Sequence, residues 1–367
     1  MITISLCMIV KNEEAVLERL LRTMSTVADQ IVIMDTGSTD RTKEIAARYT
    51  DEVYDFPWTD DFAAARNAVC QKAVSDYWMW MDADDVMEPE QAARLKNLKE
   101  TLDPSVDVVM MKYLTGFDEN GRTSFSYYRE RILKNHKGFR WQGRVHEAVP
   151  PAGNILYTDI EIQHRKEGAG DKDRNLRIYE TMLSQGEPLE PRHQFYYARE
   201  LYYHERYEDA VRVFRAFLQE PDGWVENKID ACLHLALCEE HLGHTEKAVE
   251  ALLKSFLYDS PRGEACCELG RMKMKEEKYR EAAYWYTQAL SSRPAEQTGA
   301  FVRKDCYGFL PAIQLCVCYD RLGDHRRAWH YHLKSQKLKP EHPSVRQNQT
   351  YFEHILKRPA EGQPSAQ

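Results

Sequence analysis

The sequence has no long apolar segment and no excess of positive charge. Its first apolar run, residues 2–10, is far shorter than the roughly 20 residues that span a membrane, and Lys11 ends it. We therefore expect no membrane span, no secretion signal and a cytoplasmic location. The formal net charge of the 367 residues is -8 and no long Lys/Arg cluster occurs, so nucleic acid is excluded as an expected partner.

Paired cysteines and a dinucleotide-binding glycine motif are also missing. The nine cysteines include no CxxC pair, so we predict reduced, buried thiols and neither a metal site nor a disulfide framework. A Rossmann dehydrogenase carries GxGxxG after its first strand, whereas this chain reads KNEE at residues 11–14. A dinucleotide cofactor is therefore disfavoured. A hydrophobic content of 43% is sufficient for a sizeable core in more than one domain.

The first half of the chain alternates short apolar runs with amphipathic stretches of helical spacing. Strand and helix in turn predict an α/β domain over residues 1–168, with a mostly parallel, Rossmann-like sheet. Ligands of such a sheet bind at the carboxyl ends of the strands. The predicted strands are residues 2–10, 30–35, 51–56, 77–82, 106–115 and 127–135.

The second half is helical and repeats a phrase built around alanine. Ala210, Ala248, Ala282 and Ala328 follow one another at spacings of 38, 34 and 46 residues, which is a 34-residue period with extra segments. The pattern resembles the tetratricopeptide repeat, in which small residues let paired helices approach, and predicts an all-α solenoid of about four repeats. The expected segments are a helical neck (169–190), the repeats (191–357) and a disordered tail (358–367).

Three carboxylates follow the large apolar side chains of the fourth predicted strand. Asp82, Asp84 and Asp85 come directly after residues 78–81, and Asp35 ends the second strand. Like charges this close repel each other and disfavour folding unless something gathers them. A divalent cation is the simplest candidate, because hard cations take oxygen ligands and share substrate phosphates. Since parallel strands end at one edge of a sheet, we expect Asp35 to face the same site.

Four phrases in this half resemble those of family 2 glycosyltransferases, which have the glycosyltransferase A fold. They are MIVKNEE (8–14), VIMDTGSTD (32–40), DFAAARN (61–67) and WMDADD (80–85). Each phrase alone is weak, but four in order within about 80 residues are a strong signal. The tandem with tetratricopeptide repeats is similar to the subgroup that includes the sublancin S-glycosyltransferase.

The resemblance implies a set of nucleotide-binding and metal-binding residues. Asp35 meets the nucleoside and Arg66 lies near the nucleotide, while Asp82 and Asp84 hold Mn²⁺ or Mg²⁺ on the diphosphate. His164, at the end of a predicted strand, is the candidate third protein ligand. The alternatives are a surface ion pair for Arg66 and a purely structural role for His164. The cofactor-binding candidates are Val10, Lys11, Glu13, Asp35, Arg66, Asp82 and Ala83.

The catalytic base is the least determined member of the site. Subgroup members are similar to this chain at WxGxxHE, which lies within FRWQGRVHEAV (139–149). We predict Glu147 as the base, with His146 orienting it or the acceptor, and Asp85 as a further catalytic candidate. The family's usual acidic pair has no clear counterpart in residues 100–165, and an ordinary surface loop is the alternative for this segment.

The resemblance predicts a metal-dependent, inverting transfer of a hexose or N-acetylhexosamine from a UDP-sugar to an acceptor. A peptide or protein side chain is a candidate acceptor, because repeat solenoids offer a groove for extended chains. Transfer to a cell-surface or lipid-linked glycan is one alternative. A catalytically silent scaffold of tetratricopeptide repeats is another. The repeats are also candidates for forming a homodimer.

Overall fold

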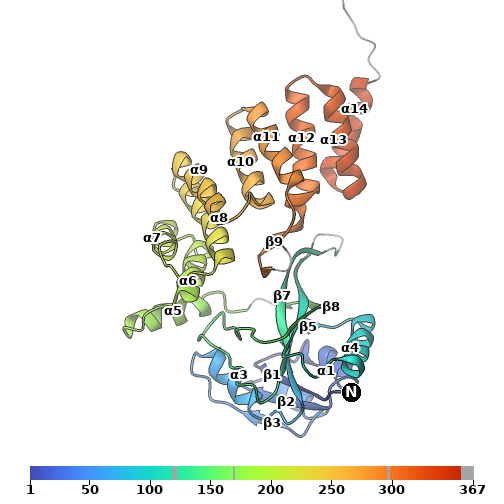
Figure 1. The fold of residues 1–367 in the computed structure, drawn as a ribbon, viewed down its shortest axis with the longest axis vertical. Helices are drawn as coiled ribbons and strands as arrows, with labels where there is room; N and C mark the ends of the chain where they lie inside the picture. The colour runs from blue at the N-terminus through green and yellow to red at the C-terminus, as the bar shows by residue number, and fades with distance from the viewer. Residues whose placement is uncertain (118–120, 122, 168–169, 296–297, 357–367) are drawn as a thin grey trace, which may run out of the picture. The chain divides into compact units, whose positions relative to one another are not determined.

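The computed structural model describes residues 1–117, 121, 123–167, 170–295 and 298–356, so the predicted tail at 358–367 lies outside the described residues (Figure 1). Contacts between residues divide the chain into two compact units. The first is made mainly of Met1–Val213, and the second holds most of the described chain that follows.

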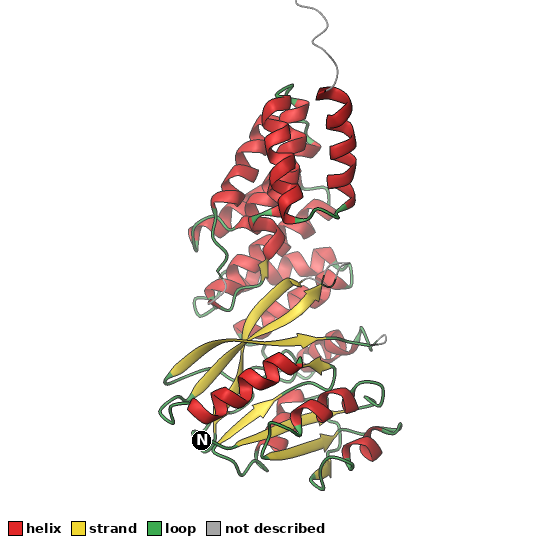
Figure 2. Cartoon of the chain, turned by 90° about the vertical axis from the view of Figure 1, so that its right-hand side faces the viewer, coloured by secondary structure: helices red, strands yellow, loops and turns green. Residues whose placement is uncertain are grey.

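A twisted sheet forms the centre of the first unit. Its strands lie in the order β3-β2-β1-β4-β7-β6-β8-β5 (Figure 2, strands in yellow). The first four strands of this order are mutually parallel, and only β7 and β5 run against the others within this path, so the predicted mostly parallel sheet is confirmed. The strands are β1 (Ile4–Val10), β2 (Gln30–Asp35), β3 (Val53–Asp55), β4 (Tyr77–Trp80), β5 (Asp85–Val86), β6 (Val108–Phe117), β7 (Thr123–Lys134) and β8 (Ile155–His164).

Apolar clusters on both faces of the sheet explain why β1 and β4 read as continuous apolar runs. Leu6 and Met8 of β1 pack in a cluster with Leu17 and Leu95, whereas Cys7 packs in a separate cluster with Val69. Alternate residues of a strand point to opposite faces, so helices cover both sides and bury the sheet. The covering helices are α1 (Leu17–Met24), α2 (Thr42–Ala46), α3 (Phe62–Cys70) and α4 (Pro89–Thr101).

The rest of the described chain is almost entirely helical, and the predicted helical repeat is confirmed. Ala210, Ala248, Ala282 and Ala328 are each fully buried and lie on α7, α9, α11 and α13. A small residue at each of these positions lets the paired helices approach closely. The elements are α5 (Arg174–Ser184), α6 (Pro191–Tyr203), α7 (Tyr207–Phe217), α8 (Val225–His241), α9 (Thr245–Lys254), η1 (Ser255–Leu257), α10 (Gly263–Lys275), α11 (Tyr279–Ser291), β9 (Val302–Arg303), η3 (Lys304–Tyr307), α12 (Phe309–Arg321), α13 (His325–Leu338) and α14 (Pro343–Leu356).

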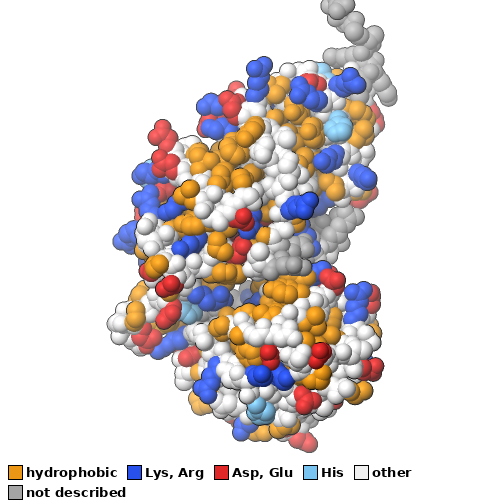
Figure 3. All heavy atoms as spheres, viewed as in Figure 1, with side chains coloured by type: hydrophobic (Ala, Val, Ile, Leu, Met, Phe, Trp, Pro, Cys, Tyr) orange, Lys and Arg blue, Asp and Glu red, His pale blue; other side chains and the backbone are white. Residues whose placement is uncertain are grey.

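The surface of the helices carries charged side chains of both signs among exposed apolar ones (Figure 3). Basic and acidic side chains are interspersed on the face drawn in Figure 3. Such mixing is typical of solvated helix faces. Within the described part of the chain, no helix combines the length and the apolar character needed to cross a membrane.

The close pairing of α10 and α11 depends on Gly270. A Cβ atom at this position would lie 2.8–2.9 Å from three ring atoms of Tyr286. We predict that Gly270→Leu destabilises the protein by about 1–3 kcal/mol, because overpacking forces the helices apart. The exposed control Lys275→Leu on the same helix should stay within about 0.5 kcal/mol of wild type. Urea unfolding measures both values, and equal stabilities for the two variants would contradict the packing argument.

Candidate active site

Acidic groups from three parallel strands meet at the carboxyl edge of the sheet. Val10, at the end of β1, pairs with Asp35 of β2, and Cys7 of β1 pairs with Trp80, two residues before Asp82. The carboxyl group of Glu13 follows β1 on the same edge. Its pKa rises to about 7, first through burial and then through the negative charges of Asp84, Asp82 and Asp40. The edge therefore concentrates negative charge.

The Asp35 carboxylate is held at the end of β2 by hydrogen bonds to one of its two oxygens. Its Oδ1 accepts hydrogen bonds from the backbone N–H groups of Gly37 at 2.9 Å and Ser38 at 2.8 Å. Gly37 has φ of 106°, a left-handed conformation that glycine adopts without strain. The second oxygen, Oδ2, is buried and has no hydrogen-bond partner among the described residues. Buried acceptors are normally satisfied, so this oxygen is available to a donor on a ligand.

Arg66 of α3 forms the cationic centre of the site. Its Nη2 donates to Asp82 Oδ1 at 2.7 Å and its Nε donates to Glu147 Oε1 at 2.6 Å. The guanidinium lies 5.1 Å from the ring centroid of Trp80 and 4.8 Å from that of Trp141, which stabilises a buried cation. Burial opposes ionisation of Asp82, but the charge of Arg66 outweighs it and lowers the Asp82 pKa to about 2. The Arg66 ion pairs are therefore buried, which rules out the alternative of a surface ion pair.

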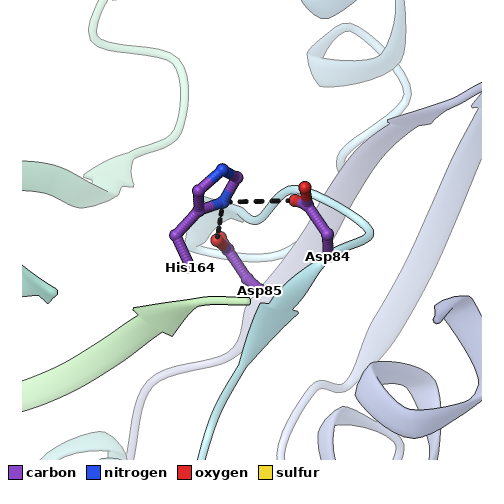
Figure 4. A group of neighbouring side chains, drawn as sticks. All are labelled: Asp84, Asp85 and His164. Atoms are coloured by element: carbon purple, nitrogen blue, oxygen red, sulfur yellow. Dashed lines mark ion pairs between the residues drawn. The ribbon is translucent and has the colours of Figure 1, made fainter. Parts of the chain in front are cut away.

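Asp84, Asp85 and His164 form a compact group beside this centre (Figure 4). Asp85 of β5 is paired in register with His164 of β8. The Nδ1 of His164 lies 3.3 Å from Asp84 Oδ1 and 3.4 Å from Asp85 Oδ1. Burial disfavours the charged imidazole, yet hydrogen bonds to both carboxylates raise the His164 pKa to about 10.

This group fits a divalent cation. One ligand atom from each of Asp84, Asp85 and His164 lies within 4.8 Å of the others. Two carboxylate oxygens and an imidazole nitrogen are suitable donors for Mn²⁺ in particular. The structure thus brings together two of the three residues predicted as metal ligands. The third, Asp82, forms an ion pair with Arg66 instead. Asp85, which was not predicted as a metal ligand, is the third member of the group.

Asp85 itself is buried deep under the site. Its Oδ2 accepts from Arg131 Nη1 at 3.1 Å and its Oδ1 accepts from the Tyr113 hydroxyl at 2.8 Å. The backbone N–H of Asp82 also donates to Asp85 Oδ2 at 3.0 Å, so the carboxylate holds the turn between β4 and β5. Arg131 was not among the predicted site residues. The available signal was an arginine directly before the apolar pair Ile132 and Leu133 in the predicted strand at residues 127–135, because buried charges are nearly always paired.

The remaining predicted residues lie around this edge. Lys11 is exposed, and Ala83 packs in the core cluster beneath the sheet edge. His146 does not contact Glu147 side chain to side chain but turns toward α6, where its Nε2 lies 2.8 Å from Glu200 Oε1. The segment that carries both is also tied to α3, because the Phe62 N–H donates to the Arg144 carbonyl at 2.8 Å.

Four matches to known proteins bear on this domain. Residues 5–156 match the model described as Glycosyl transferase family 2. A TPR repeat-containing protein of Synechococcus elongatus is 32% identical over 149 residues, covering 41% of this chain and 36% of the relative. The SPbeta prophage-derived glycosyltransferase SunS of Bacillus subtilis is 26% identical over 228 residues, covering 57% of this chain and 51% of SunS. The lipopolysaccharide core biosynthesis glycosyltransferase LpsC of Rhizobium meliloti is 26% identical over 152 residues, covering 39% of this chain and 56% of LpsC.

Residues 5–156 are therefore a family 2 glycosyltransferase domain, and the chain joins this domain to helices of the tetratricopeptide-repeat kind, as the motifs predicted. The matched segments span only 36% to 56% of these relatives' own length. The activity, substrates and partners of the whole protein do not follow from the matches alone.

Two neighbouring aspartates should differ sharply in their effect on stability. Asp85→Ala leaves Arg131 fully buried without its anionic partner and should lower the free energy of unfolding by about 3–5 kcal/mol. Asp84→Ala removes a half-buried carboxylate whose partner is His164 and should cost about 1 kcal/mol. Chemical denaturation measures both. A larger loss for Asp84→Ala than for Asp85→Ala would contradict the anchoring role of Asp85.

The buried His193 of α6 should make stability depend on pH. Burial, with the charges of Arg192 and His146, lowers its pKa from 6.5 to about 4. Between these values the unfolded chain binds a proton that the folded chain does not, so stability falls as the pH drops from 6.5 to 4. The loss is about 3 kcal/mol, at about 1.4 kcal/mol per pKa unit.

Urea unfolding of wild type and His193→Asn at pH 7 and pH 4.5 isolates this contribution. The difference in stability between the two pH values should shrink in the variant by most of that amount. An unchanged difference would show that His193 takes up its proton at the same pH in both states.

Proposed function

We propose that this protein is a metal-dependent, inverting glycosyltransferase that moves a sugar from a nucleotide sugar to an acceptor. The observation that carries the proposal is the convergence of Asp35, Asp84 and His164 with the buried Arg66 at the carboxyl edge of a family 2 domain. This edge is where α/β sheets bind nucleotides. The similarity to SunS, a protein named as a glycosyltransferase, supports the same reading.

The donor's nucleoside is proposed to lie against the ends of β1 and β2. Asp35 Oδ2, which is buried and has no partner among the described residues, is placed to accept from a ribose or base donor. Glu13, with a pKa of about 7, is half-buried nearby, and Val10 and Lys11 complete this wall. We propose uridine diphosphate as the carrier, with a hexose or N-acetylhexosamine as the sugar.

The diphosphate is proposed to lie between two positive centres. Asp84, Asp85 and His164 would hold Mn²⁺ or Mg²⁺, and the bound cation would stabilise negative charge on the leaving diphosphate. Arg66 supplies a fixed positive charge on the other side, with Asp82 holding its guanidinium in place. Because His164 is protonated at neutral pH in the absence of a cation, it must release that proton when it becomes a ligand.

Glu147 is the proposed base for the acceptor. Arg66 takes one of its two carboxylate oxygens, and the Glu147 side chain is only 12% exposed, so its position is well defined. A base must lie within hydrogen-bond reach of the acceptor proton, and a rigidly held carboxylate meets this condition best. The acceptor nucleophile would then attack the anomeric carbon as the bond to the diphosphate breaks.

The acceptor is proposed to be a peptide or protein side chain that the helical repeats present to the transferase domain in the cytoplasm. The similarity to LpsC, named for lipopolysaccharide core biosynthesis, favours a glycan acceptor as the second candidate. Homodimer formation through the repeats is part of the first proposal. A panel of peptide and glycan acceptors, read by mass spectrometry, separates the two candidates.

Nucleotide-sugar turnover tests the proposed function. Purified protein should release UDP from one or two UDP-sugars only when Mn²⁺ or Mg²⁺ is present, and Asp84→Ala should lower this rate at least tenfold, because a cation ligand is lost. The matched control Asp159→Ala removes an exposed aspartate of β8 that pairs with Lys112 and should keep the wild-type rate. Absence of turnover together with absence of UDP binding would favour the silent scaffold.

A further inference from the structure

His146 is held in a strained backbone conformation by helix α6. Its φ is 52°, in the left-handed region that residues other than glycine seldom adopt. Such a conformation costs about 1–3 kcal/mol and persists only when surrounding contacts impose it. The His146 ring stacks on Tyr196 at 4.2 Å between centroids, and its carbonyl accepts from Arg192 Nη2 at 3.2 Å. Both partners belong to α6.

Glu200 makes the polar contact that fixes the direction of the ring. Its Oε1 lies 2.8 Å from His146 Nε2 and also accepts from Asn175 Nδ2 at 3.1 Å, so the His146 loop and α5 meet on one carboxylate oxygen of α6. Glu200 is only 6% exposed. Burial raises its pKa, but the hydrogen bonds from His146 and Asn175 outweigh burial and lower it. The carboxylate is thus ionised, and its Oε1 is shared by His146 and Asn175.

Docking of the two helices does not by itself require this buried charge. Val145 packs with Ile178, Tyr179 and Met182 in an apolar cluster that already joins the loop to α5. Burying a carboxylate costs free energy that an apolar side chain would avoid. Because apolar packing already joins these elements, we take the contribution of the buried Glu200–His146 contact to be a defined orientation of His146.

The residue that follows His146 is Glu147, whose carboxylate meets Arg66 at 2.6 Å, and Arg66 in turn meets Asp82 at 2.7 Å. We infer that Glu200 is a positioning residue: through His146 it sets the backbone that presents Glu147 to Arg66. The inference deepens the proposed function and rests on it, since Glu147 and Arg66 are members of that site. On this inference, α5 and α6 help to position the Glu147 side chain of the glycosyltransferase domain.

Three variants separate positioning from structural support. Glu200→Leu keeps the volume and removes the acceptor oxygen, whereas Glu200→Gln keeps an oxygen for His146. The matched control Glu239→Leu removes a buried glutamate that pairs with His244 at 2.8 Å in the second unit. Per folded molecule, kcat for Mn²⁺-dependent UDP-sugar hydrolysis should fall about tenfold in Glu200→Leu and stay within about threefold of wild type in the other two. The Kd for UDP should stay within about threefold in all of them.

A double-mutant cycle shows whether Glu200 acts through Glu147. If it does, Glu200→Leu should lower kcat little further in a Glu147→Gln background, because the two changes damage the same contact. Independent, multiplicative losses would overturn the inference, and so would a Glu200→Leu enzyme with wild-type kcat per folded molecule.

A second readout needs no turnover. Arg66 lies against Trp80 and Trp141, so its release should change tryptophan fluorescence. The difference spectrum of Glu200→Leu should match that of Glu147→Gln and be absent in Glu239→Leu. If wild type turns over no UDP-sugar, the proposed function fails, while the spectra still decide the positioning role: unlike spectra for Glu200→Leu and Glu147→Gln would overturn it.

Discussion

The candidate site depends on one buried positive charge. Arg66 lies between Trp80 and Trp141 and neutralises Asp82 and Glu147, two carboxylates that come from a strand end and a distant loop. Without a cation between them, these acids would repel each other in a poorly solvated setting, and at least one would be forced to protonate. A guanidinium keeps its charge at any physiological pH, so it holds both groups in a fixed arrangement.

A second buried arginine supports the edge from below. Arg131 pairs with Asp85, and Asp85 receives the Asp82 backbone N–H, so the turn that carries the acids is tied to β7. The acidic residues therefore divide by depth. Asp85 is fully buried and anchors the turn, while Asp84 and His164 are partly exposed beside it. Asp85 therefore combines an anchoring contact to Arg131 with its place in the proposed cation site.

The positions of the acidic residues at the sheet edge follow from the order of the predicted strands. The contacts of Arg131 and His146 do not, because their partners are distant in the sequence. Asp35 and Asp82 end predicted parallel strands, so their meeting at one edge was predictable, and His164 reached the acids because it ends a strand. Arg131 escaped prediction because its partner lies 46 positions away in sequence. The turn of His146 toward Glu200 escaped it as well, since nothing in the WxGxxHE phrase indicates a left-handed residue.

We propose that Asp84, Asp85 and His164 hold a divalent cation together with a nucleoside diphosphate. The decisive experiment is electron paramagnetic resonance of Mn²⁺ bound to histidine-¹⁵N-labelled protein with UDP. We expect magnetic coupling of the bound Mn²⁺ to one histidine nitrogen and to phosphorus, with the nitrogen coupling lost in His164→Ala. A spectrum of fully hydrated Mn²⁺ in the presence of protein and UDP would contradict it.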